Sequence, residues 1–142
     1  MKKFLSVLFV ALLLAGASFA QCDKHVVYSS EKQEFIGTDG QVEDIKTDAL
    51  TLEFSQGKIV LNAPGKGDAL TGIIKETDCQ WKTLYKEGKA VYKLDFQKPQ
   101  SDETSGGSIT IEAKDGVLTI LVEIAKMEGR KVKLIVSKYE EK

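Results

Sequence analysis

Side chains that could carry catalysis are few in this chain of 142 residues. It has a single histidine, His25, and two cysteines, Cys22 and Cys79. A hydrolase of the Ser-His-Asp or Cys-His type needs a histidine beside its nucleophile. His25 lies close to Cys22 in the sequence, but a cysteine held in a disulfide cannot attack a substrate. We therefore expect His25 to lie at the surface or at a strand edge, without a catalytic role.

Metal sites and catalytic carboxylate pairs are not indicated either. One histidine and two paired cysteines cannot complete the ligand set of a zinc site, and the acidic stretches TDGQVED and SDETSGG lack the spacing of a calcium-binding loop. The acids that a glycosidase could use fall on polar strand faces near lysines: Glu53, Glu76, Asp78 and Asp95. Such carboxylates usually serve solubility. The sequence predicts no enzyme, metal or cofactor, with a carboxylate-based hydrolase as the less favoured alternative.

The first residues have the pattern of a secretory signal peptide. Lys2 and Lys3 precede an apolar run, and Ser18-Phe19-Ala20 offers small residues at the cleavage positions. We expect residues 1–20 to be the signal peptide and residues 21–142 to form one secreted or periplasmic domain. The run is shorter than the roughly 20 apolar residues of a spanning helix, so no transmembrane span is expected.

Cys22 follows the expected cleavage site by two residues, where it could carry a lipid anchor or form a disulfide. Lipidation needs a small residue directly before the cysteine, and Gln21 occupies that position. In an oxidising compartment Cys79 is the one available partner. We therefore predict a Cys22–Cys79 disulfide, with a lipoprotein or two free thiols as the less favoured outcomes.

Apolar and polar residues alternate from Ala49 to Tyr139, which is typical of half-buried antiparallel strands. In LTLEFSQGKIVLN the alternation resumes after Gln56-Gly57, a pair that favours a tight hairpin turn. Two stretches depart from the pattern. The alternation slips near Lys75, which predicts a bulge, and QVEDIKTDA has apolar residues at helical spacing, which predicts one or two helical turns.

The sequence therefore predicts an all-β fold, an antiparallel meander of about eight strands. It would form either a lipocalin-like up-and-down barrel or a two-sheet β-sandwich. The layout resembles lipocalin-like barrels in architecture only, because the Gly-x-Trp of lipocalin first strands is absent. An immunoglobulin domain is not expected, because Trp81 follows both cysteines. Most strands are also too short for an outer-membrane barrel.

The expected function is non-catalytic binding. The formal net charge is −1, and removal of residues 1–20, which hold two lysines and no acid, makes it −3; this argues against nucleic acid as a partner. A cavity for a small apolar ligand inside the barrel is predicted to be lined by Phe54, Trp81, Tyr92 and Phe96, which would otherwise simply form the core. The alternative is a module with a solid core that binds an envelope protein through an edge strand or the loop QKPQSDETSGGS.

Overall fold

The computed structural model describes residues 22–65, 67, 69–98 and 101–142, so the predicted signal peptide lies outside the described residues. The described chain forms nine strands and one short 3₁₀ helix, η1. The elements are β1 (Val26–Ile36), β2 (Val42–Lys46), β3 (Leu50–Ser55), β4 (Lys58–Asn62), β5 (Leu70–Thr83), β6 (Glu87–Gln97), β7 (Thr104–Lys114), β8 (Val117–Ile124), η1 (Ala125–Met127) and β9 (Lys131–Glu141).

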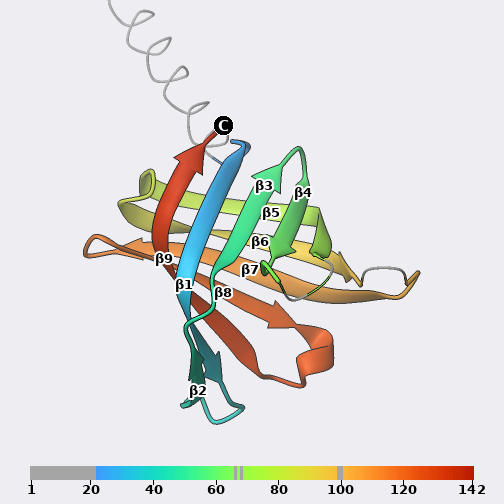
Figure 1. Cartoon of the computed structure of the whole chain (residues 1–142). Helices are drawn as coiled ribbons and strands as arrows, with labels where there is room; N and C mark the ends of the chain where they lie inside the picture. The colour runs from blue at the N-terminus through green and yellow to red at the C-terminus, as the bar shows by residue number, and fades with distance from the viewer. Residues whose placement is uncertain (1–21, 66, 68, 99–100) are drawn as a thin grey trace, which may run out of the picture.

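The strands form one antiparallel sheet that closes on itself. From β3 to β9 each strand pairs with its neighbour in sequence, and β9 returns to pair with β1 along almost its whole length. Strand β1 pairs with β3 at its beginning and with the extra strand β2 at its end. This confirms the predicted all-β fold and makes it a closed barrel of eight strands with one strand added (Figure 1).

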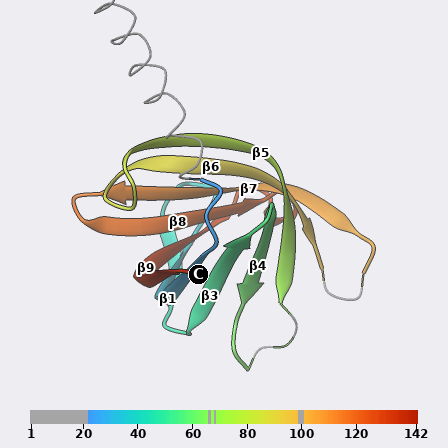
Figure 2. The ribbon, with the colours of Figure 1, turned by 90° about the horizontal axis from the view of Figure 1, so that it is seen from above.

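The barrel is flattened into two layers whose strands cross at a steep angle (Figure 2). Strands β9, β1, β3 and β4 make one layer, and β5 to β8 make the other (Figure 1). The layers are joined by two short ladders, Lys58–Leu61 with Leu70–Ile73 and Thr119–Glu123 with Lys131–Ile135. Because β5 continues past β4 and β9 continues past β8, an opening lies beyond each ladder.

The inward strand faces form a single apolar core, as the alternation predicts. In β6, for example, Ala90, Tyr92, Leu94 and Phe96 are all buried, whereas Lys93 between them is exposed. The turn at Gln56-Gly57 has positive φ at both positions, 51° and 75°, which suits the twist of a tight hairpin. The bulge predicted near Lys75 is present as a register shift between Ile74 and Glu76.

The helical turns predicted over residues 41–49 are wrong. Val42–Lys46 is the extended strand β2, and Val42 and Ile45 are 48% and 52% exposed, so they form no buried helical face. β2 pairs with the end of β1, where β3 no longer reaches. The buried Gln33 side chain of β1 also donates to the Asp48 carbonyl at 2.7 Å, just after β2. Pairing with a distant edge therefore outweighs a weak helical spacing.

The polar loop expected between β6 and β7 is shorter than the sequence indicates. Thr104 to Gly107 belong to β7 and pair with Leu94 to Gln97 of β6. Gly107 is needed there for packing, because an added Cβ would lie 2.3 Å from the Glu123 carbonyl oxygen and 2.7 Å from the Phe96 ring. Glycine and serine favour loops in general, but here the absent side chain lets the Phe96 ring pack against the strand.

Tyr92 makes the core sensitive to alkaline pH. Burial, with a smaller contribution from the charge of Asp23, raises the pKa of Tyr92 from 10.0 to about 12. The neutral phenol is thus favoured in the fold, so this stabilisation is complete below pH 10 and is lost as the pH rises towards 12. We expect Tyr92 to account for about 2 kcal/mol of the unfolding free energy lost over that interval. Urea unfolding of the wild type and of Tyr92→Phe at several pH values tests this: equal losses in both proteins would contradict it.

Candidate functional site

The opening between β5 and the β3–β4 turn is occupied by the segment Cys22-Asp23-Lys24, which precedes β1. Cys22 and Cys79 form the predicted disulfide, which ties this segment to β5. A small cavity of about 180 Å³ remains between the segment, Phe54 and Ile74. His25 Nε2 lies 2.6 Å from Glu53 Oε1, which fixes the segment to β3 as well. The single histidine therefore contacts a carboxylate at the barrel surface.

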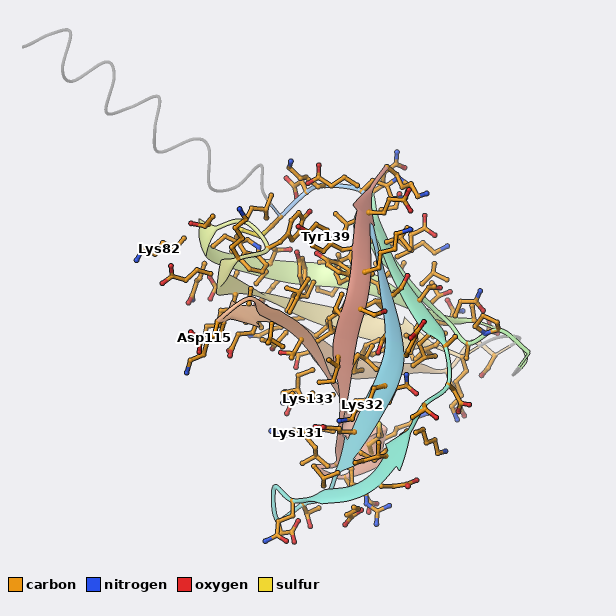
Figure 3. The ribbon with its side chains drawn as sticks, turned by 60° about the vertical axis from the view of Figure 1, so that its left-hand side comes forward. Lys32, Lys82, Asp115, Lys131, Lys133 and Tyr139 are labelled. Carbon is orange, nitrogen blue, oxygen red and sulfur yellow. A yellow bond between two sulfur atoms is a disulfide. The ribbon has the colours of Figure 1, made fainter. Side chains whose placement is uncertain are left out.

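The opening between β8 and β9 forms the larger cavity, about 890 Å³, which we call the β8–β9 groove. Its lining comes from the β5–β6 turn, the start of β8 and the second half of β9. The lining residues are Tyr85, Lys86, Gly116, Val117, Leu118, Ile135, Val136, Ser137, Lys138 and Tyr139. Figure 3 shows this side of the molecule, with Tyr139 near the upper end of β9.

Tyr85 positions one wall of the β8–β9 groove from a strained turn. Its φ is 61°, in the left-handed region, which costs a residue with a bulky side chain about 1–2 kcal/mol. The ring is held by aromatic neighbours, with its centroid 4.4 Å from that of Tyr139 and 6.0 Å from that of Trp81. Its hydroxyl donates to Glu141 Oε1 at 3.0 Å. These contacts offset the backbone strain, and strain of this kind is often found at functional sites.

The charges around the β8–β9 groove are unevenly distributed. Burial, and next the hydrogen bond to Glu141, raise the pKa of Tyr85, so its hydroxyl remains a donor at neutral pH. Glu141 is also paired with Lys24 Nζ at 3.1 Å, and the hydrogen bonds from Lys24 and Tyr85 lower the pKa of Glu141. The groove lining itself holds Lys86 and Lys138 and no carboxylate. Neither ammonium group forms an ion pair within the described part of the chain.

The four aromatic residues predicted to line an interior cavity are all in the core, each at most 9% exposed. The ring centroids of Phe54 and Tyr92 are 4.9 Å apart, and the Trp81 ring contacts the Tyr85 ring. Phe96 packs over Gly72 and Gly107 at another part of the core. An interior ligand cavity among these residues stays a prediction.

The sequence did not single out the residues of the β8–β9 groove. Tyr85 lies in a turn, LYKEG, whose residue types do not announce a left-handed tyrosine. Tyr139 is one residue out of phase with Val132, Leu134 and Val136, and it reaches the inward face only because the pairing of β9 with β1 skips Ser137. Only the separation of β9 from β8 leaves Tyr139 at 44% exposure. A large aromatic residue in a short turn was the one signal that could have indicated this site.

The carboxylates considered for a hydrolase each have a separate partner at the barrel surface. Glu76 pairs with Lys93 at 3.2 Å, and Asp95 with Lys75 at 3.6 Å. Glu53 contacts the histidine described above, and Asp78 accepts from Gln80 at 2.8 Å. Within the described residues no three acidic, histidine or cysteine side chains gather as a possible metal site.

No family model matches this chain, and no curated protein or solved structure was found to be similar to it. Among the described residues, no helix has the length and apolar character to cross a membrane.

Proposed function

We propose that this protein is a non-catalytic, extracytoplasmic binding domain whose binding site is the β8–β9 groove. The main observation in support of this proposal is that β9 separates from β8 beyond Ile135. Val117 and Tyr139, which are 52% and 44% exposed, line the cavity of about 890 Å³ at this opening. Small-molecule and peptide sites typically combine such an apolar concave surface with a few polar groups, here supplied by two lysines.

The extracytoplasmic location is supported by chemistry at the other opening. A disulfide persists in oxidising compartments, and the first twenty residues have the pattern of a secretory signal. The disulfide fixes the segment that occupies the opening beside β5, whereas the β8–β9 groove has no such cover among the described residues. The two openings thus differ in a way that suits one of them for an external partner.

Two other sites considered from the sequence are less well supported by the structure. Ligand binding inside the barrel would require Phe54 and Tyr92, whose rings are in contact, to move apart. Binding through the loop after β6 loses much of its surface, because Thr104–Gly107 is paired strand. The acids considered for a hydrolase, Glu53, Glu76, Asp78 and Asp95, each contact a different partner at the barrel surface.

The proposal can be tested with an apolar anionic dye, 8-anilinonaphthalene-1-sulfonate, titrated into the purified protein while its fluorescence is recorded. We expect saturable binding that Val117→Asp weakens about tenfold, because the substitution places a carboxylate in the apolar lining. Val42→Asp is the matched control, since Val42 is an equally exposed strand valine on β2, outside the groove lining. Equal dye binding by the Val117→Asp variant and the wild type would overturn the proposal.

A further inference from the structure

We infer that the occupant of the β8–β9 groove is an extended, acidic segment of another protein, which adds as a strand to the free edge of β9. The inference rests on the proposed function and goes beyond it by naming the class of partner. It depends on three features of the groove: a free backbone edge, side chains that differ between the two strand faces, and unpaired positive charge.

The second half of β9 has backbone groups available for pairing. β8 pairs with Lys131–Ile135 only, so the backbone of Val136–Glu141 has β1 on one side and, among described residues, no strand on the other. That stretch is about 20 Å long, which is a common strand length. Strand addition to such an edge derives its affinity from main-chain hydrogen bonds and its specificity from alternate side chains.

The two faces of this edge favour different side chains on an added strand. Tyr139 pairs with the buried Tyr28, so it lies on the inward, apolar face, and Val136 lies there too, opposite the buried Ser30. Lys138 pairs with Ser29 and lies on the outward face. Because side chains alternate along a strand, an added segment would place apolar residues beside Tyr139 and polar residues beside Lys138.

The positive charge of the groove lining favours acidic residues at the polar positions of the added segment. Lys86 and Lys138 line the groove with no carboxylate among the lining residues, although the chain as a whole is slightly acidic. Aspartate or glutamate on the partner would pair with these two ammonium groups. A second copy of this chain is disfavoured as the occupant, because lysine on an exposed strand edge, here Lys138, is a common device against self-association.

The experiment uses the purified protein and a synthetic peptide of about eight residues in which Asp or Glu alternates with Val or Ile. Binding is measured by isothermal titration calorimetry, and backbone protection by amide hydrogen exchange. Two control peptides carry Lys at every acidic position or N-methyl groups on alternate amides. We expect the acidic peptide to bind at least about tenfold more tightly than either control and to slow exchange between Val136 and Glu141.

Charge reversal provides the matched variants. Lys86→Glu combined with Lys138→Glu should weaken the acidic peptide about tenfold and strengthen the lysine peptide. Lys32→Glu combined with Lys133→Glu makes the same change in net charge on β1 and β9, outside the groove lining (Figure 3), and should alter neither affinity.

The results separate this inference from the proposed function. Dye binding that depends on Val117 but is not displaced by the acidic peptide would overturn the inference and leave the proposed function standing. Tight binding of the N-methylated peptide, or no slowing of exchange in β9, would overturn strand addition. A dimer in light scattering without peptide would show that a second copy is the occupant. Dye binding independent of Val117 would overturn the proposed function and the inference together.

Discussion

Replacing both Cys22 and Cys79 by serine is expected to lower the free energy of unfolding by about 4 kcal/mol. The bridge joins positions 57 residues apart, so it restricts a large part of the unfolded chain. A loss of that size is a large share of the 5–15 kcal/mol that typically stabilises a domain of about this size. Guanidinium unfolding of the double variant and the wild type, without reductant, measures the difference.

The same experiment has an internal control. Wild-type protein unfolded in reductant should match the serine variant, whose own stability should not respond to reductant. We also expect faster amide exchange at the start of β1, because the segment that precedes Val26 is no longer tied to β5. A difference below about 1 kcal/mol would contradict the expectation and would indicate that the unfolded chain is already compact without the bridge.

Gly107→Ala is expected to destabilise the barrel by about 3 kcal/mol, at the upper end of the range for overpacking. The new Cβ would lie 2.3 Å from the carbonyl oxygen of Glu123 in β8 and 2.7 Å from the Phe96 ring. The ring can turn only within a filled core, and the β8 backbone is held by its ladder with β7. The clash must therefore be relieved by separating paired strands.

Gly106→Ala is the matched control for this substitution. Gly106 is the preceding residue of the same strand, but nothing lies within 4 Å of a Cβ placed there. Its replacement should change the unfolding free energy by no more than about 0.5 kcal/mol. Urea unfolding of the two variants gives the comparison. Similar stabilities for both would show that β7 can shift away from Phe96 and that Gly107 is not required for packing.

Local patterns in the sequence were sufficient for most of the strands, though not for β2, and for the turn at Gln56-Gly57 and the disulfide. Period-two alternation in stretches such as KAVYKLDFQ predicts which face of a strand is buried, because one face packs against the core regardless of which strands pair with it. The pair Gln56-Gly57 sets its own turn geometry. The Cys22–Cys79 pairing followed from counting, since no other cysteine exists. These features depend on a few adjacent residues or on composition, so no knowledge of the tertiary structure was needed.

Other features were decided by contacts between distant residues. The spacing of apolar residues from Gln41 to Ala49 predicts a helix. In the structure Val42–Lys46 is a strand instead, because it pairs with the end of β1. The sequence places Gly107 in a loop, whereas the structure places it in β7, where the Phe96 ring packs against it.

The sequence by itself determined an antiparallel β domain with an alternating core and a predicted disulfide. The tertiary structure alone decided that β9 closes the barrel on β1 while separating from β8 after Ile135. That separation brings Tyr85 and Tyr139, 54 positions apart in the chain (139 − 85), into ring contact beside an open groove. Alternation specifies which side of a strand is buried, but not how far two strands remain paired, because pairing length depends on how the two layers cross.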